Sequence, residues 1–278
     1  MTILEFVHQA TKKLTVSNVP TARLDSLILL EDALGKDRSW LLAHPTHLVS
    51  AAKLESLVAQ IERRANHEPL AYIRGRGEFY GREFLVTADT LQPRPETETM
   101  IELLLEQAKS RKLKVESIVD VGTGSGCIAI TAKLEKPNLN VVATDISEAC
   151  LKVAKMNAKK LGADIQFYRG DLLVPLPITS HQSPITILAN LPYVPDSHTI
   201  NQAAMHEPKL AIFGGDDGLD YYRQLFDQIK EQKISVDLLL SEALPPQHEK
   251  LESLANAYGF LSIKSQDFIQ VFKSTSSA

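Results

Sequence analysis

The 278-residue chain has few cysteines and no excess of basic charge. Its two cysteines, Cys127 and Cys150, do not have CxxC spacing, which argues against a disulfide framework and suits a reducing compartment. The formal net charge is -4, whereas a protein that binds extended nucleic acid usually presents a cationic face. We therefore do not expect DNA to be a substrate.

Long apolar runs and metal-binding patterns are missing as well. No stretch of about 18 uninterrupted apolar residues occurs, so we expect no membrane-spanning helix and no membrane partner. Residues 1–30 do not combine a charged start, an apolar run and a cleavage site, so we expect a cytoplasmic protein. The eight histidines are scattered, and the closest pair, His44 and His47, has no further ligand motif nearby. We therefore expect no metal site.

The pattern of apolar residues changes twice along the chain. Helical spacing fills most of residues 1–70, which indicates a small helical bundle that serves recognition or packing. Glycines alternate with β-prone residues in 71–93, which predicts a β-hairpin linker. In residues 94–278, short apolar runs alternate with amphipathic stretches, so we predict an α/β domain with helices on both faces of a mostly parallel sheet. The runs Phe260–Ile263 and Phe268–Phe272 predict an antiparallel strand pair at its end.

A glycine-rich segment follows the first apolar run of the α/β domain. After Asp120 and Val121 come the residues that we predict to contact a cofactor: Gly122, Thr123, Gly124, Ser125 and Gly126. Alternating glycines let a ligand approach the backbone at the carboxyl edge of such a sheet. Asp145 ends the next apolar run, where its carboxylate can accept hydrogen bonds from both hydroxyls of a ribose. The third glycine stands one position too early for a dinucleotide fingerprint and no Gly-Lys-Ser/Thr follows, so the segment favours a nucleoside over a phosphate.

Three more residues belong to the predicted cofactor site, besides Asn190 of the motif described next. Ile146 follows Asp145, and Asp171 ends the next predicted strand, where its carboxylate can read the edge of an adenine. Leu172 can then pack on the adenine ring. A simple helix or turn cap is the alternative interpretation of Asp171.

A second motif, Asn190, Leu191, Pro192 and Tyr193, directly follows the predicted strand Ile185–Ala189. An amide or aromatic amine nitrogen is a poor nucleophile because its lone pair is delocalised, so an enzyme that modifies it must orient the NH2 group. The side-chain oxygen of Asn190 and a backbone carbonyl of the turn can accept its two hydrogens. Pro192 stiffens the turn, and the ring of Tyr193 can cover a planar group. We predict that this turn is catalytic.

The motifs resemble those of a known family. The GxGxG form is similar to motif one of Rossmann-like methyltransferases, and Asn-Leu-Pro-Tyr resembles the Asn-Pro-Pro-Tyr motif of methyltransferases that act on amide and amino nitrogens. With the segments Glu78–Glu98, Asp120–Ile130 and Glu207–Leu225, most of the chain resembles the peptide-chain release-factor glutamine methyltransferases. The resemblance implies a Rossmann-like methyltransferase domain and a helical substrate-recognition domain that helps to hold the release factor. It also implies S-adenosyl-L-methionine as methyl donor, and as target the side-chain amide nitrogen of glutamine in the Gly-Gly-Gln loop of peptide chain release factors.

Several positions depart from the pattern of that family. Leu191 replaces the first proline of the tetrad, and Gln92 stands where an aliphatic residue is usual. The segment 238–247 lacks a glycine, and the segment 265–274 lacks a glycine and an arginine. None of these changes removes a proposed donor or acceptor, so they bear on efficiency or partner preference more than on reaction type.

Three other functions remain open at this point. A ribosomal-protein glutamine methyltransferase would carry nearly the same catalytic motifs. A nucleic-acid amino-group methyltransferase would share the tetrad, but it should add a basic and aromatic region to hold a flipped base, which this chain lacks. A non-enzymatic scaffold would have no need of Asn190 and Tyr193. Glu96 and Glu207 are candidate substrate contacts, although ion pairing is the commoner role of such acids.

Overall fold

The structure is a computed structural model, and it describes three stretches of the chain: residues 1–109, 115–176 and 184–275. The chain divides into two compact units. The first comprises Met1–Gly75 with the short segment Asn201–His206, and the second comprises Arg76–Ile200 with Glu207–Ala278.

Five helices make up most of the first unit: α1 (Ile3–Val16), α2 (Ala22–Leu34), α3 (Arg38–Ala43), α4 (Ala51–Ala65) and α5 (Leu70–Arg74). Thr2 begins α1 with a capping box, because its hydroxyl accepts from the Glu5 N–H while the Glu5 carboxylate accepts from the Thr2 N–H. Gly35 ends α2 in the left-handed conformation, with φ 64°. The core of the unit consists of apolar side chains that include Phe6, Leu14, Leu30, Leu57 and Ile61. The predicted helical character of this region is confirmed.

The second unit starts with an antiparallel hairpin. Its strands are β1 (Arg76–Phe79) and β2 (Arg82–Leu85), and its turn consists of Tyr80 and Gly81, with φ 51° and 68°. Two turn residues with positive φ match the twist of a tight hairpin. The hairpin begins at Arg76 and not at residue 71, where the predicted linker starts, because α5 continues to Arg74.

Seven strands form one sheet in the order β5-β4-β3-β6-β7-β9-β8. Their bounds are β3 (Ser117–Val121), β4 (Asn140–Asp145), β5 (Gln166–Arg169), β6 (Ile185–Ala189), β7 (Val236–Glu242), β8 (Phe260–Gln266) and β9 (Ile269–Ser274). The strands from β5 to β7 are parallel, whereas β9 is antiparallel to both β7 and β8. This confirms the predicted mostly parallel sheet with its antiparallel C-terminal pair. The strand order reverses at β3 and β6, which is where open α/β sheets bind ligands.

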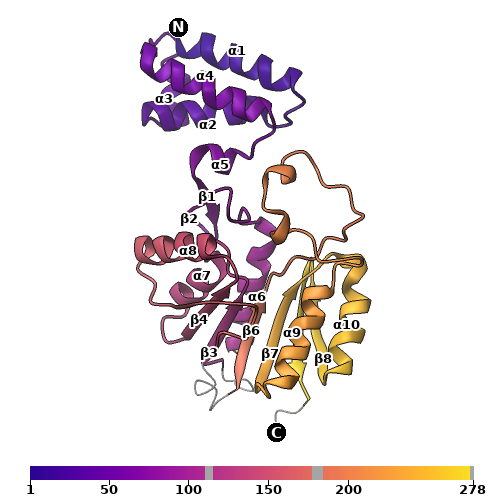
Figure 1. The fold of residues 1–278 in the computed structure, drawn as a ribbon. Coiled ribbons are helices and arrows are strands. Elements are labelled where there is room, and N and C mark those ends of the chain that lie inside the picture. Colours follow the sequence, from indigo (N-terminus) through magenta and orange to yellow (C-terminus); the bar gives the residue numbers. More distant parts are fainter. Residues whose placement is uncertain (110–114, 177–183, 276–278) are drawn as a thin grey trace. The chain divides into compact units, whose positions relative to one another are not determined.

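Helices cover both faces of this sheet (Figure 1). They are α6 (Glu98–Lys109), α7 (Cys127–Glu135) and α8 (Glu148–Leu161) on one face, and α9 (Asp220–Glu231) and α10 (His248–Ala257) on the other. Alternation along β7 explains the two cores, because Leu238 and Leu240 enter the first and Leu239 enters the second. The short 3-10 helices are η1 (Pro95–Thr97), η3 (Ala204–His206), η4 (Lys209–Ala211) and η5 (Pro245–Gln247). Within the three described stretches, no helix has the length and apolar character needed to cross a membrane.

Candidate active site

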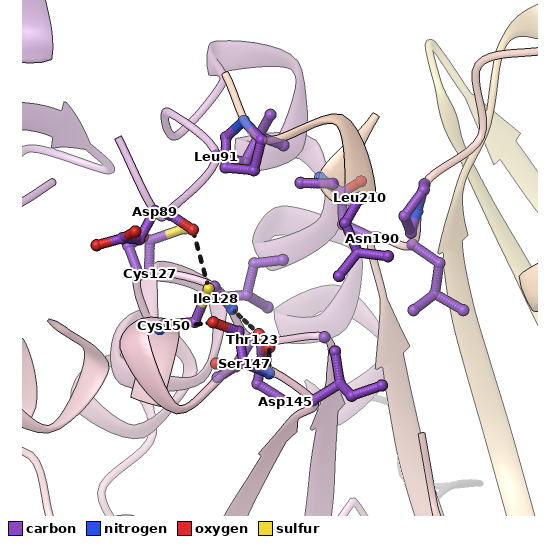
Figure 2. Close-up of a pocket in the computed structure, with 18 of the residues that line it drawn as sticks. Asp89, Leu91, Thr123, Cys127, Ile128, Asp145, Ser147, Cys150, Asn190 and Leu210 are labelled. Atoms are coloured by element: carbon purple, nitrogen blue, oxygen red, sulfur yellow. Dashed lines mark hydrogen bonds between the residues drawn. The ribbon is translucent and has the colours of Figure 1, made fainter. Parts of the chain in front are cut away.

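A cavity of about 360 Å³ lies at the carboxyl ends of β3, β4 and β6 (Figure 2). Its size is within the range of small-molecule and cofactor sites. Most of the residues that the sequence singled out lie in its wall: Gly122, Thr123, Gly124, Ser125, Asp145, Ile146, Asp171, Leu172, Asn190, Leu191 and Pro192. Gly126 and Tyr193 do not belong to the wall. The fold thus brings two motifs that are far apart in the sequence to one cavity.

The glycines of the loop after β3 have two different tasks. Gly122, Gly124 and Gly126 all adopt left-handed backbone conformations, with φ 71°, 56° and 83°. A Cβ on Gly124 would point into open space, so this part of the backbone is accessible to a ligand. A Cβ on Gly126 would lie 2.9 Å from Ile130 Cδ1 and 3.1 Å from Ala154 Cβ. Gly126 therefore permits close packing of the loop on α7 and α8 and does not itself face the cavity.

The Asp120 side chain stabilises this loop through hydrogen bonds. One of its carboxylate oxygens accepts from the Thr123 hydroxyl at 2.6 Å and from the Ala129 N–H at 3.1 Å. The other oxygen is buried and has no hydrogen-bond partner among the described residues. Burial raises the pKa of Asp120 to about 7, and the two hydrogen bonds oppose that shift.

Asp145 ends β4 in the cavity wall. Its Oδ2 accepts from the Gly124 N–H and its Oδ1 from the Ser147 N–H, both at 2.8 Å. Burial raises the pKa of Asp145, while these two backbone hydrogen bonds oppose the shift. Each carboxylate oxygen can accept more than one hydrogen bond, so both keep capacity for the hydroxyls of a ribose. Together with the open backbone at Gly124, these contacts fit a nucleoside-containing cofactor.

Asp171 and Leu172 also line the cavity. Asp171 is exposed, and its Oδ2 accepts from Gln228 Nε2 of α9 at 3.3 Å. Leu172 is buried and has φ 45°, which is unusual for a residue with a branched side chain. The exposed carboxylate beside an apolar side chain can receive the edge and the face of a planar ring.

Both cysteines also reach the cavity wall. The Cys150 thiol donates to the Asp89 carbonyl at 3.2 Å (Figure 2). Burial raises the pKa of Cys127 to about 12 and that of Cys150 to about 11. The thiols therefore stay protonated at neutral pH, so they contribute to packing and do not act as nucleophiles.

A chain of hydrogen bonds fixes the side chain of Asn190. Asn190 Nδ2 donates to Thr97 Oγ1 at 3.1 Å, and the Thr97 hydroxyl donates to Glu242 Oε2 at 2.6 Å. The Tyr193 hydroxyl donates to the other carboxylate oxygen, Glu242 Oε1, at 3.0 Å. Because the nitrogen of the Asn190 amide is used in this way, its oxygen is left to accept from a ligand. Within the described part of the chain that oxygen forms no hydrogen bond.

The backbone of the turn is held by Tyr222. The hydroxyl of this fully buried residue has one hydrogen, and two carbonyl oxygens are placed to accept it, Glu242 at 2.6 Å and Ala189 at 3.0 Å. The hydroxyl oxygen also receives a backbone hydrogen bond from Leu191. The side chain of Leu191 is buried. No hydrogen bond to its carbonyl occurs among the described residues, so the carbonyl has capacity for a ligand N–H.

The two acidic residues considered as substrate contacts behave differently. Glu207 is buried and pairs with Arg94, whose Nη2 lies 2.6 Å from Glu207 Oε2. Burial raises the pKa of Glu207, and the Arg94 guanidinium opposes this shift. Glu207 is thus an ion-pair partner, and Arg94 is the member of the pair that lines the cavity. Glu96 is exposed.

Sequence reasoning missed three polar residues of the site. Thr97 lies among acidic residues that only suggested a helix start, and Glu242 ends the strand that neighbours β6. Asn157 of α8 is fully buried, and its side chain bonds both the N–H and the carbonyl of Leu85 and also the carbonyl of Ser125. The one signal in the sequence for Asn157 is that it is a polar residue on the apolar face of a predicted helix. For Glu242 the one signal is its position at the carboxyl end of a predicted strand.

Comparisons with known proteins agree with this architecture. Residues 5–75 match the PrmC N-terminal domain, and residues 96–207 match the Methyltransferase small domain. Among solved structures, the hMettl16 catalytic domain in complex with MAT2A 3'UTR hairpin 1 aligns with a TM-score of 0.53 over 82% of each chain, at 11% identity. The T. thermophilus 16S rRNA N2 G1207 methyltransferase in complex with AdoMet and guanosine aligns with a TM-score of 0.50 over 72% of this chain and 49% of its own, at 14% identity. These two likenesses concern the fold alone.

Sequence relatives give the family. A release factor glutamine methyltransferase from Coxiella burnetii is 37% identical over 264 residues, which cover 92% of this chain and 92% of that protein. The protein of the same name from Bacillus subtilis is 38% identical over 82% of this chain and 80% of its own. At this level of identity over most of both chains, the resemblance noted in the motifs is confirmed. The chain belongs to the release factor glutamine methyltransferase family.

Proposed function

We propose that this protein transfers a methyl group from S-adenosyl-L-methionine to the side-chain amide nitrogen of the glutamine in the Gly-Gly-Gln loop of a peptide chain release factor. The names of its relatives support the class of substrate. A cytoplasmic site of action is part of the proposal, because release factors act in translation. The helical residues 1–70 are proposed to hold the release factor, with 71–93 as linker and 94–278 as catalytic domain.

One observation carries the proposal, namely the fixed orientation of the Asn190 amide. Its nitrogen is bound to Thr97, so its oxygen can accept one N–H of a glutamine side chain. The Leu191 carbonyl can accept the other. Two acceptors on one NH2 group orient it and favour a geometry in which the nitrogen lone pair points at the methyl group. An acid or alcohol substrate would offer at most one hydrogen to this pair.

The remaining residues of the site would bind the cofactor and enclose the substrate amide. When bound, S-adenosyl-L-methionine supplies an electrophilic methyl group on a positively charged sulfur. Asp145 would accept hydrogen bonds from the ribose hydroxyls, and Asp171 and Leu172 would bind the adenine. The loop 122–125 would contact the rest of the cofactor where its backbone is accessible. Burial and the neighbouring Glu242 carboxylate raise the pKa of Tyr193, so its hydroxyl keeps its proton and the hydrogen bond to Glu242. The Tyr193 ring would cover the planar amide of the substrate.

The experiment that tests this function uses the full-length protein with methyl-labelled cofactor and three candidate substrates: a release factor, ribosomal proteins and DNA. Label should enter the release factor, and it should be lost when the glutamine of the Gly-Gly-Gln loop is replaced by asparagine. Peptide mass spectrometry then assigns the modified side chain. Labelling of ribosomal protein or DNA but not of the release factor would reject the proposal, and so would undiminished labelling of the asparagine variant.

A further inference from the structure

The buried carboxylate of Glu242 lies at the centre of a hydrogen-bond network but takes no part in the chemical step itself. It ends β7, the strand next to β6, and only 1% of the residue is exposed. Ser241, directly before it, is in register with Ala189, directly before Asn190. Strand pairing therefore places Glu242 beside the catalytic turn, although the two are far apart in the sequence.

We propose that Glu242 is a positioning residue that acts through Thr97 to set which end of the Asn190 amide faces the substrate. This inference rests on the proposed function, because it assigns a role in orienting the glutamine amide. Glu242 does not touch substrate or cofactor in this scheme. Its effect reaches the Asn190 amide through two hydrogen bonds, at 2.6 Å and 3.1 Å, and the Asn190 oxygen would pass it on to the reacting nitrogen.

The direction of these hydrogen bonds follows from what each group can donate. Burial raises the pKa of Glu242, and the hydrogen bonds from Thr97 and Tyr193 oppose this shift because they stabilise the ionised carboxylate. In its ionised form Glu242 has no hydrogen and can only accept, so Thr97 donates its single hydroxyl hydrogen to it. The Thr97 oxygen can then only accept from Asn190, which has to turn its nitrogen inward. The Asn190 oxygen is consequently presented outward. A reversed amide would present two hydrogens to the substrate NH2 group and repel it.

The second carboxylate oxygen is fixed in the same way. It accepts from Tyr193, which follows Asn190 in the same turn, and the Glu242 carbonyl accepts from the buried Tyr222 hydroxyl. Glu242 thus lacks freedom to rotate away from Thr97. The buried carboxylate has donors on both oxygens, as a buried charge requires.

The test uses variants of the full-length protein and a short Gly-Gly-Gln peptide. Thr97→Val removes the hydroxyl but keeps the shape of the side chain. We expect its single-turnover transfer rate to fall about tenfold or more, because the productive amide orientation then leaves a part-buried N–H of Asn190 without its acceptor. Thr97→Ser keeps the hydroxyl and should stay within about threefold of the wild type. Cofactor affinity by calorimetry should be unchanged in both variants.

A matched control comes from α7. Thr131 is buried, its hydroxyl has no partner among the described residues, and it does not line the cavity. Thr131→Val makes the same chemical change away from the network and should leave the rate unchanged. A rate loss in Thr131→Val equal to that in Thr97→Val would overturn the proposal, and so would a Thr97→Ser variant as slow as Thr97→Val.

The role of Glu242 is isolated by a double-mutant cycle. Glu242→Gln introduces hydrogens and removes the constraint that fixes the direction of the Thr97 hydroxyl. If Glu242 acts through Thr97, the variant that combines Glu242→Gln and Thr97→Val should be much less impaired than the product of the two single losses. Fully multiplicative losses would mean that the two residues act separately and would overturn the relay.

A spectroscopic measurement separates this inference from the proposed function. The side-chain NH2 signals of Asn190 are identified by their absence from the spectrum of Asn190→Ala. They should shift in Thr97→Val and Glu242→Gln but not in Thr131→Val, whether or not the peptide is a substrate. Failure of the wild type to methylate release factor or peptide would reject the proposed function, whereas unshifted Asn190 signals would reject the network.

Discussion

The loop after β3 and the turn after β6 both follow buried strands and both face one cavity, yet they are held in different ways. The loop 122–126 owes its shape mainly to its own glycines and to Asp120, only a few residues away, and hydrogen bonds with Asp145 and Asn157 add to these. The turn 190–193 owes its shape to side chains that come from distant parts of the chain. These are Thr97, Tyr222 and Glu242.

This difference separates the two tasks of the site. A loop shaped by local backbone geometry offers a surface for a cofactor. A turn held by a long-range network can fix the orientation of a single amide group, because the Glu242 carboxylate takes the only hydrogen of Thr97 and leaves the Thr97 oxygen to accept from Asn190. Changes in the loop should therefore alter cofactor affinity, and changes in the turn should alter the rate of transfer.

The largest effect is expected from Asn190→Ala. The variant lacks one acceptor for the reacting NH2 group, so the rate of methyl transfer should fall by about 10²-fold or more, as it does when a preorganised polar group is deleted from other active sites. Cofactor affinity should change much less. Single-turnover rates and calorimetry on the same preparation measure both quantities. An active Asn190→Ala would remove the basis for the amide-orienting turn.

Asp145→Ala should produce the opposite pattern. A charge-assisted hydrogen bond is worth about 1.5–3 kcal/mol, so S-adenosyl-L-methionine should bind about tenfold or more weakly. The rate at saturating cofactor should fall less than the affinity. Unchanged affinity in folded Asp145→Ala would contradict the assignment to the ribose.

What could be predicted from the sequence follows the same division. The glycine loop was predictable because left-handed backbone positions leave a glycine pattern, and the parallel sheet because apolar runs alternate with amphipathic stretches. Even so, Gly126 was assigned to the cofactor although the structure places it against Ile130 and Ala154. Thr97 and Glu242 were not predicted, because a hydrogen bond between positions 145 residues apart leaves no local pattern.

A smaller effect on stability is expected from the buried carboxyl of Asp120. Its pKa is raised from 3.8 to about 7 in the folded protein, so the folded state binds the proton more tightly than the unfolded chain does. The stability from this group is full below its unfolded value and is lost as the pH rises through about 7. Linkage gives a loss of about 2 kcal/mol between about pH 5.5 and about pH 8.

Asp120→Asn should abolish that part of the pH dependence. Its free energy of unfolding, measured in urea at both pH values, should fall by less than that of the wild type over the same interval. The comparison uses the change with pH, so any constant cost of placing an amide in the buried site cancels. Equal pH dependence in the two proteins would show that the Asp120 carboxyl is ionised over the whole range.

Leu191→Pro should have the smallest effect on the reaction, and it tests which atoms of the turn matter. Proline retains a carbonyl, so both proposed acceptors for the substrate amide survive, and transfer should stay within about tenfold of the wild type. Proline has no N–H, however, and the Tyr222 hydroxyl would lose the hydrogen bond that it receives from Leu191. With the smaller side chain in a buried site, this should lower the free energy of unfolding by about 1–2 kcal/mol.

A variant that is less stable but active would locate the function of Leu191 in its carbonyl. A folded but inactive variant would mean that the hydrogen bond to Tyr222 is needed to aim the turn, and the network around Glu242 would then extend through the backbone of the motif as well as through its side chains.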